Sequence, residues 1–361
     1  MTNVSEGVVV RPVGIVGAGT MGAGIAQVAL EAGHHVRLYD AAPEALAGAF
    51  ERIRDGLTRR AAKAGHTEGW VEGSFSRLEF ALSPEEAAAD AELVIEAAIE
   101  DLAAKREIFE ALAMAAPADA ILATNTSALS VTAIAEATGR PDRVLGLHFF
   151  NPAPVMRLVE VVVTSAADPA VAARAMGLMT AWGKTPVRCS DSPGFIVNRV
   201  NRPFTIGALR LLEAGLADVT AIDDAMREAG FPMGPFELMD LIGIDVNLAA
   251  ARGVWDGLGR PDRLRPSPIQ ERLVEAGQLG RKTGSGFYRY GAAGVATGLA
   301  SVPTDGRPDP GPVMAADDIA ARIRDAVDAE ARLAESEGVA TADDIRLALE
   351  LGAGHPARTA S

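Results

Sequence analysis

The chain has 361 residues, enough for about two domains, and its 48% hydrophobic and 23% charged residues are typical of a globular protein. A formal net charge of −14 argues against a nucleic-acid partner, and the single cysteine, Cys189, excludes an internal disulfide and favours a reducing, cytoplasmic compartment. No apolar run approaches the ~18 residues of a membrane span, and the first residues lack the pattern of a secretory signal.

The first half alternates short β-branched runs with helical segments. The run at 9–17 stops at glycine and is followed by a helix, and 43–65 is helical with basic residues on one side. Strands are expected at 9–17, 34–40, 93–100, 120–127, 143–150, 157–165 and 187–190. Strands and helices alternating over short connections predict an α/β domain with a doubly wound parallel sheet over residues 1–190.

The second half has a different pattern. From 191 to 290 we find helical periodicity only, and DSPGFIVNR is expected to open a long helix, with Asp191 or Ser192 as its cap. Residues 291–313 are rich in Gly, Pro and Ala and indicate a flexible linker. Helical pattern returns in 314–361, where we expect a further helical unit lying on the main one.

A weak internal repeat joins two parts of this half. EAGLADVTAIDDAMREAGFP (213–232) resembles ESEGVATADDIRLALELGAGHP (335–356), with a one-residue slip. Each segment is expected to form a helix that ends at a glycine, then a short turn, and then a second helix that ends in a glycine-rich stretch. We interpret 314–361 as a partial second copy of the helical module, and the alternative is convergence of alanine-rich helices.

A dinucleotide fingerprint stands at 17–22. GAGTMG follows a strand and opens a helix, so its glycines permit a tight turn and close approach of a pyrophosphate to the helix N-terminus. Asp40 ends the next strand, where a ribose-binding acid belongs. A carboxylate there accepts hydrogen bonds from a 2′-hydroxyl and repels a 2′-phosphate, which favours NAD over NADP. The alternative is a tight glycine turn without a ligand.

His148 is the histidine best placed for chemistry. If 143–150 and 157–165 pair antiparallel with the turn at Pro154, then His148 and Glu160 are equally far from that turn and face each other. A glutamate among valines is costly unless it is paired. The pattern predicts a dyad in which the carboxylate holds one ring nitrogen and leaves the other as a base. The alternative is an ordinary core histidine.

Two polar residues are candidates to complete the site. Ser127 follows a strand at the edge where open α/β sheets bind ligands, although it is equally suited to cap a helix. Asn198 lies in an otherwise apolar stretch, and its alternative role is a structural hydrogen bond at the surface or between domains.

At these residues the sequence resembles the 3-hydroxyacyl-CoA dehydrogenase family, over roughly residues 10–290. The motifs that carry the resemblance are GIVGAGTMGAGIAQV, VIEAAIED, NTSALS, GLHFFNPAPVMRLVEVV, DSPGFIVNR, GFPMGPFELMDLIGID and GRKTGSGFY. The resemblance implies a Rossmann-type domain, then an all-helical substrate and dimerisation domain over 191–290, and hence a homodimer. Gly207 departs from the family, whose members commonly carry glutamate there.

The resemblance also implies site residues. The family's catalytic residues fall on Ser127, His148, Glu160 and Asn198. Its NAD contacts carry over to Gly17, Gly19, Thr20, Met21, Gly22, Asp40, Glu100, Lys105, Asn125 and Asn151, and a further contact in the KTG motif to Lys282.

The reaction implied is the reversible oxidation of (3S)-hydroxyacyl-CoA to 3-oxoacyl-CoA, as in fatty-acid β-oxidation or butanoate metabolism. The basic run that includes Arg54 and Lys63 would offset the acidic field for the anionic coenzyme A, unless it is only a solvated helix face. No metal site is expected. A dehydrogenase of free hydroxy acids and a non-catalytic NAD-binding protein are the alternatives.

Overall fold

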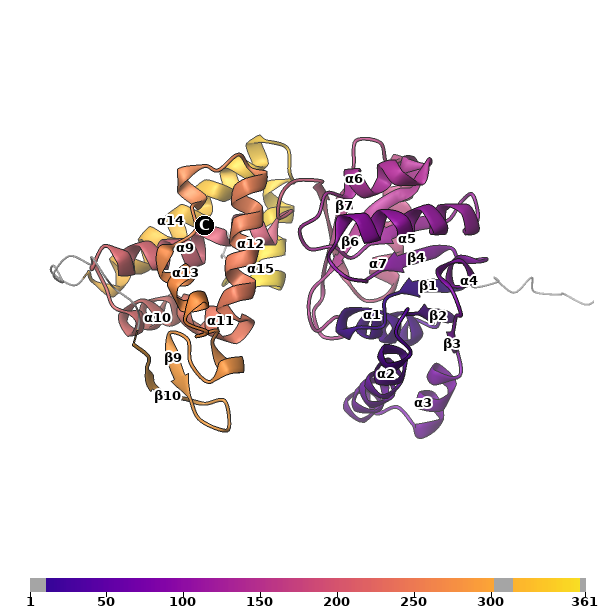
Figure 1. Ribbon diagram of the computed structural model, residues 1–361, viewed down its shortest axis with the longest axis horizontal. Helices are drawn as coiled ribbons and strands as arrows, with labels where there is room; N and C mark the ends of the chain where they lie inside the picture. The colour runs from indigo at the N-terminus through magenta and orange to yellow at the C-terminus, as the bar shows by residue number, and fades with distance from the viewer. Residues whose placement is uncertain (1–10, 302–313, 358–361) are drawn as a thin grey trace, which may run out of the picture. The chain divides into compact units, whose positions relative to one another are not determined.

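The computed structural model describes residues 11–301 and 314–357 and divides into two units, Met1–Asp191 and Ser192–Ser361 (Figure 1). Each unit is described by itself. Within the described ranges no helix combines the length and the apolar character that crossing a membrane requires.

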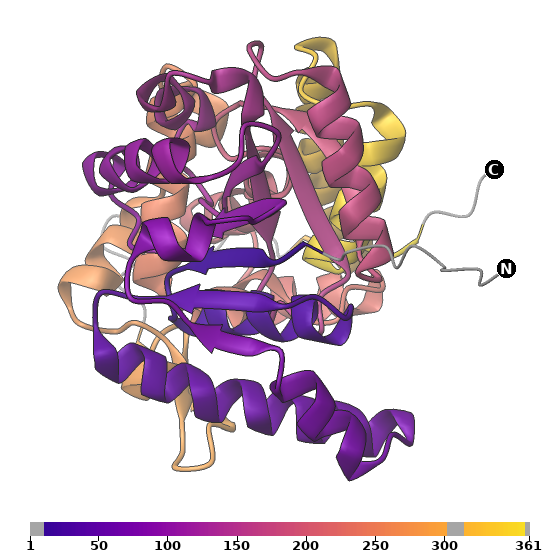
Figure 2. The same ribbon diagram turned by 90° about the vertical axis from the view of Figure 1, so that its right-hand side faces the viewer.

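The first unit is built on one eight-stranded sheet with the order β3-β2-β1-β4-β5-β6-β7-β8 (Figure 2). Every neighbouring pair is parallel except β6 and β7. The strands are β1 (Val13–Val16), β2 (Val36–Tyr39), β3 (Leu78–Phe80), β4 (Leu93–Glu96), β5 (Ile121–Thr124), β6 (Val144–Phe149), β7 (Leu158–Val163) and β8 (Thr185–Ser190). β1, β4, β5, β6 and β7 are buried along their whole length, as expected of apolar runs inside a covered sheet.

Helices alternate with these strands, which confirms the predicted doubly wound α/β architecture. They are α1 (Thr20–Glu31), α2 (Pro43–Ala64), α3 (Glu68–Phe75), α4 (Pro84–Ala88), α5 (Leu102–Ala115), α6 (Val131–Ala135) and α7 (Pro169–Ala181). The chain runs from β1 outward to β3 and returns to β4 on the other side of β1. That change of direction is the point at which open α/β sheets bind ligands.

The second unit is mainly helical. Its helices are α8 (Val197–Val200), α9 (Arg202–Glu213), α10 (Val219–Glu228), α11 (Pro235–Ile242), α12 (Ile244–Gly257), α13 (Pro268–Glu275), α14 (Ala316–Ser336) and α15 (Ala342–Ala353). α14 packs against α8, α9 and α10, and α15 packs against α8. The helical pattern expected after Met314 is therefore present and docked on the main helices. The finer division of this unit into a module, a linker and a partial module stays a prediction.

The prediction of one long helix that begins within DSPGFIVNR is wrong. Gly194 and Phe195 have positive φ angles of 78° and 49°, so the helix begins only at Val197. It breaks again at Asn201, because Pro203 has no N–H to continue the helical hydrogen bonds. Asp191 caps a different helix, since its carboxylate accepts hydrogen bonds from the backbone N–H groups of Val131 and Thr132 at the start of α6.

The helical character expected of 191–290 is confirmed up to its last residues, where β9 (Tyr288–Tyr290) instead pairs antiparallel with β10 (Ala296–Leu299). β10 lies inside the segment indicated as a linker, and residues 302–313 of that segment lie outside the described residues. Two buried carboxylates hold the hairpin. Asp240 accepts the N–H groups of Phe287 and Tyr288, and Asp223 accepts the Tyr288 hydroxyl at 2.7 Å.

Asp223 makes the stability of this unit depend on pH. Burial raises its pKa to about 7, against the opposing effect of its hydrogen-bond donors. Between about pH 4 and 7 the folded chain keeps a proton that the unfolded chain has lost, so stability falls as pH rises through this range and levels off above it. Relative to Asp223→Asn, wild type should lose about 2–3 kcal/mol of unfolding free energy between pH 5 and pH 7.

Urea unfolding followed by circular dichroism measures this difference. Asp325→Asn, a change at an exposed carboxyl group, is the matched control and should track wild type at every pH. If the difference in unfolding free energy between wild type and Asp223→Asn did not change between pH 5 and pH 7, Asp223 would be charged in the folded chain over that whole range. The prediction would then be wrong.

Candidate functional site

The glycines of the 17–22 segment serve three distinct purposes. Gly17 has φ 107°, and a Cβ built on it would lie 2.4 Å from the carbonyl oxygen of Ala97 at the end of β4. A Cβ on Gly22 would lie 1.8 Å from the carbonyl oxygen of Gly17, so α1 packs directly on the turn. A Cβ on Gly19 would meet nothing within 4 Å. The segment is therefore tight on its protein side and open at Gly19, the N-cap of α1, where a phosphate group could approach the helix N-terminus.

Asp40 follows β2 at the same edge of the sheet. Its Oδ2 accepts the N–H of Ala18 at 2.7 Å, and its Oδ1 accepts the N–H of Ala42 at 2.9 Å. The Arg52 guanidinium of α2 donates to the Ala18 carbonyl oxygen at 2.9 Å. The carboxylate therefore lies beside the glycine turn, which is where a ribose-binding acid is needed. Arg52 is one of the basic residues of the 43–65 helix, and its hydrogen bond supports the glycine turn.

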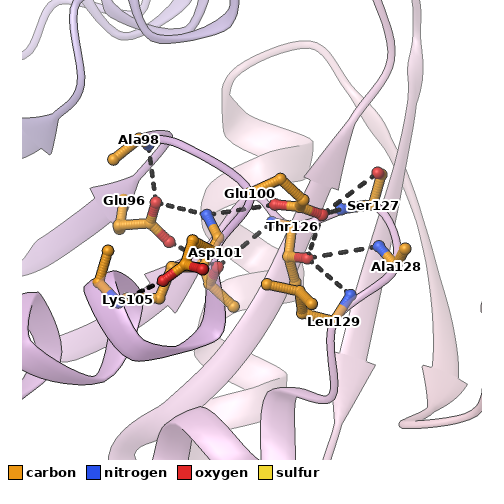
Figure 3. Close-up of polar contacts among 11 residues, drawn as sticks. Glu96, Ala98, Glu100, Asp101, Lys105, Thr126, Ser127, Ala128 and Leu129 are labelled. Carbon is orange, nitrogen blue, oxygen red and sulfur yellow. Dashed lines mark hydrogen bonds and ion pairs between the residues drawn. The ribbon is translucent and has the colours of Figure 1, made fainter. Parts of the chain in front are cut away.

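A buried ion pair fixes the end of β4 (Figure 3). Glu96 is fully buried, and its carboxylate accepts Lys105 Nζ at 2.6 Å, Thr124 Oγ1 at 2.7 Å and the N–H of Ala98 at 2.7 Å. Lys105, expected to contact the cofactor, is 1% exposed and also lies 3.4 Å from Glu100. Sequence reasoning missed Glu96. The available signal was an acid as the last residue of an otherwise apolar strand.

Glu100 joins the ends of β4 and β5. One of its oxygens accepts Thr126 Oγ1 at 2.6 Å, the N–H of Ser127 at 2.9 Å and the Ser127 hydroxyl at 3.3 Å (Figure 3). Burial alone would raise the pKa of Glu100, but the Thr126 hydrogen bond and the Lys105 charge outweigh it, so the pKa lies below its usual value. Glu100 is therefore ionised at neutral pH. The alternative role of Ser127 as a helix cap is wrong, because Ser130 caps α6.

His148 and Glu160 face each other across β6 and β7, as predicted. The two strands are antiparallel, and the residues are directly paired in the register. His148 Nδ1 and Glu160 Oε2 lie 2.6 Å apart, with the carboxylate fully buried and the histidine 6% exposed. An ionised Glu160 accepts the Nδ1 proton, so the lone pair of the neutral ring is on Nε2. β6 runs parallel to β5, so His148 lies toward the same sheet edge as Ser127.

The loop between β6 and β7 is held from both sides. Asn125 Oδ1 accepts the N–H of Phe149 at 2.8 Å, which joins the ends of β5 and β6. Asn151 begins the loop and is exposed. The buried Lys184 ammonium donates to the carbonyl oxygens of Ala153 and Met156. Sequence reasoning missed Lys184, which lies 28 residues from Met156 and belongs to no motif that it used.

Four other predicted residues are not among the contacts described above. Arg54 and Lys63 are exposed on α2, and Arg54 is 3.4 Å from Glu72 of α3. Asn198 and Lys282 belong to the second unit, where Asn198 lies on α8 and Lys282 pairs with Asp245 at 2.6 Å. Their predicted roles remain predictions.

The first unit therefore gathers a glycine turn, an acid beside it and a His–Glu pair along one sheet edge. A histidine with its Nδ1 proton held by a buried carboxylate is a general base at Nε2. In the described part of the chain no group of three His, Cys, Asp or Glu side chains is arranged to hold a metal ion.

Comparison with known families gives two matches. The model of the 3-hydroxyacyl-CoA dehydrogenase NAD binding domain matches residues 12–192, and the model of the C-terminal domain of the same family matches residues 194–290. The matched ranges together cover most of the chain and meet close to the division between the two units.

Individual relatives are also similar. The chain is 48% identical to the 3-hydroxyadipyl-CoA dehydrogenase of Escherichia coli K12 over 284 residues, which cover 78% of this chain and 60% of that protein. It is 43% identical over 282 residues to a probable 3-hydroxybutyryl-CoA dehydrogenase of Bacillus subtilis, covering 78% of this chain and 98% of that protein. The crystal structure of an Escherichia coli K12 3-hydroxybutyryl-CoA dehydrogenase has a TM-score of 0.85 and 37% identity, covering 96% of this chain and 89% of that one.

Asp40 offers a test of the dinucleotide site. Asp40→Ala removes both the acceptor for a ribose hydroxyl and the charge that repels a 2′-phosphate. We expect the KM for NAD to rise and the difference in kcat/KM between NAD and NADP to become smaller. Steady-state kinetics with both cofactors measure this, and equal efficiency of wild type with NAD and NADP would contradict the assignment.

Proposed function

Because this chain belongs to the 3-hydroxyacyl-CoA dehydrogenase family, we propose that it catalyses the reversible NAD-dependent oxidation of (3S)-3-hydroxyacyl-CoA to 3-oxoacyl-CoA. The observation that carries the proposal is the buried 2.6 Å contact between His148 and Glu160, on the sheet edge that also bears the glycine turn. A nucleotide site and a base on one edge are what hydride removal from an alcohol requires.

The residues at the glycine turn fit NAD. The turn closes tightly at Gly17 and Gly22, where any Cβ would collide with backbone, and stays open at Gly19. The open side faces the start of α1, whose first N–H groups suit a pyrophosphate. Asp40 would hold the adenosine ribose, while Thr20, Met21, Glu100, Lys105, Asn125, Asn151 and Lys282 are the further contacts we propose. Bound NAD supplies the acceptor for the hydride that leaves C3.

His148 performs the proton transfer in this proposal. Glu160 holds the Nδ1 proton and so keeps the ring in the tautomer with its lone pair on Nε2. Nε2 takes the proton of the 3-hydroxyl group as the C3 hydrogen leaves, and the buried carboxylate stabilises the imidazolium that forms. In the reverse direction the same Nε2 returns the proton to the 3-oxygen.

Ser127 and Asn198 would position the reacting groups. The Ser127 hydroxyl is exposed and is oriented by the ionised Glu100, so it is suited to hydrogen-bond the 3-oxygen of the substrate. We assign Asn198 a positioning role toward the same groups. Arg54 and Lys63, both exposed on α2, would meet the phosphates of coenzyme A, and the excess of acidic residues elsewhere makes such a local basic surface necessary. The composition supports a cytoplasmic location.

A substrate panel tests the proposed reaction. Acetoacetyl-CoA and longer 3-oxoacyl-CoA thioesters should oxidise NADH, which is read from its absorbance, whereas the free 3-oxo acids should not. Turnover of free acids alone would favour a dehydrogenase of free hydroxy acids. NADH binding without turnover of any substrate would favour a non-catalytic protein.

The dyad gives the sharpest kinetic prediction. His148→Ala removes the base, so turnover should fall by ~10²–10⁴. Glu160→Gln keeps a hydrogen bond but loses the charge that stabilises imidazolium, and turnover should again fall substantially. Because the two residues act as one unit, the double variant should be little worse than His148→Ala alone.

Steady-state kinetics on the three variants measure these losses, and NADH fluorescence reports cofactor affinity, which should barely change. If His148→Ala kept near-normal turnover, or if the two losses simply multiplied, His148 would be a core histidine and not the base.

A further inference from the structure

Arg202, the first residue of α9, is a buried cation without a counter-charge. It is 6% exposed, and its Nε is enclosed and has no hydrogen-bond partner among the described residues. Burial lowers the pKa of its guanidinium to about 10, and no neighbouring carboxylate raises it again. At neutral pH the side chain is therefore still charged, and the described part of the chain does not compensate that charge.

The other buried charged side chains of the described residues all have partners. Arg199 of α8, three residues earlier, is fully buried, and its guanidinium lies 2.9 Å from Glu330 and 2.7 Å from Glu337. The remaining buried charges, each with at least one hydrogen-bond partner, are Glu96, Lys105, Glu160, Lys184, Asp223, Asp240 and Glu330. Within the described ranges Arg202 is the exception.

The surroundings of Arg202 make this exception costly. Ile206, four residues later, is buried and packs with Val254 of α12 and with Leu264. Residues four apart share a face of a helix, so Arg202 begins a face of α9 that is otherwise apolar. An apolar side chain of similar size would be more stable at such a position than an unpaired cation. A cation kept there fits a site whose anion comes from outside the chain.

Arg202 also follows Asn198 by four residues. Asn198 lies on α8, and Asn201, the residue between α8 and α9, keeps a right-handed helical backbone with φ −81° and ψ −4°. Asn198 and Arg202 therefore lie on one face, with Cβ atoms ~5–6 Å apart. The inference rests on the proposed function at this step, because it takes Asn198 to position the reacting groups at C3 of the substrate.

The part of the substrate within this reach is the acyl chain beyond C3. A few methylene groups span the distance from Asn198 to Arg202, so a group at the end of a short acyl chain would meet the guanidinium. The planar N–H groups of an arginine match the two oxygens of a carboxylate. The phosphates of coenzyme A lie at the opposite end of the thioester and are assigned above to Arg54 and Lys63.

We propose that Arg202 binds a carboxylate at the end of the acyl group, so that the preferred substrate is the coenzyme A thioester of a short 3-hydroxy dicarboxylic acid. Arg202 is then a specificity-determining residue. An acyl chain that ends in a carboxylate compensates the buried cation, whereas one that ends in a methyl group leaves it unpaired. The spacing of Asn198 and Arg202 sets the distance between the 3-oxygen and the carboxylate.

Kinetics with a matched pair of substrates test the proposal. 3-Hydroxyadipyl-CoA and 3-hydroxyhexanoyl-CoA have acyl chains of equal length, which end in a carboxylate and in a methyl group. Wild type should prefer the first by about ten- to a hundredfold in kcat/KM, mainly through a lower KM. Arg202→Met should abolish this preference. It should also raise kcat/KM for 3-hydroxyhexanoyl-CoA, because an apolar chain end then meets an apolar side chain.

Two further variants are controls. Arg202→Lys keeps the charge without the planar donor pair and should retain part of the preference. Arg322→Met removes an exposed arginine of α14 and should keep all of it. Equal efficiency of wild type with both thioesters, or a preference that survives in Arg202→Met, would overturn the assignment of Arg202 and leave the proposed reaction standing. Turnover of neither thioester by wild type would contradict the proposed reaction and this inference with it.

Unfolding in urea without any substrate gives an independent test. Arg202→Met replaces an uncompensated buried cation by an apolar side chain, so its urea midpoint should lie above that of wild type. Arg199→Met is the matched comparison at a compensated arginine, and its midpoint should lie below wild type because the buried Glu330 loses a partner. A midpoint of Arg202→Met below wild type would show that its guanidinium is compensated within the chain, and would overturn the proposal.

Discussion

A carboxylate enclosed by apolar side chains must find a hydrogen-bond donor, and this requirement shapes both units. Glu160 is fully buried among the valines of β7, and the register that places it opposite His148 brings its Oε2 to 2.6 Å from His148 Nδ1. A shift of one residue would turn Glu160 to the opposite face of the sheet and break its contact with His148. The electrostatic need of one side chain thus specifies the pairing of two strands and, with it, the position of the base.

The same need acts elsewhere in the molecule. Glu96 takes its donors from β5 and α5 and so fixes the loops at the point where the sheet changes direction. Asp223 takes its donors from α11 and the β9 hairpin and fastens them to α10. In each case a buried acid ties together segments that are distant in the sequence. The cost of leaving the acid unsatisfied makes these ties specific.

Features whose stabilising residues are close together in the sequence could be predicted, and features whose stabilising residues are far apart could not. Seven of the eight strands of the first unit and the His148–Glu160 pairing were predictable because apolar runs are local signals and a short turn restricts the register. The edge strand β3 was missed because it has three residues, none of them fully buried, and so gives no apolar run. The break at Asn201 was missed because helical periodicity outweighed Pro203 in the interpretation. The β9 hairpin and the ion pair of Lys105 with Glu96 were missed because their stabilising partners lie 47 and 9 residues away along the chain, outside any short pattern.

The hydrogen bonds of Asp40 limit how the nucleotide preference of this fold can be changed. One carboxylate oxygen accepts the N–H of Ala18 in the glycine turn, and the other accepts the N–H of Ala42, the residue before α2. A substitution that removes the carboxylate therefore also removes two backbone contacts that shape the turn. A chain redesigned for a 2′-phosphate would need new partners for these two N–H groups as well as a new partner for the phosphate.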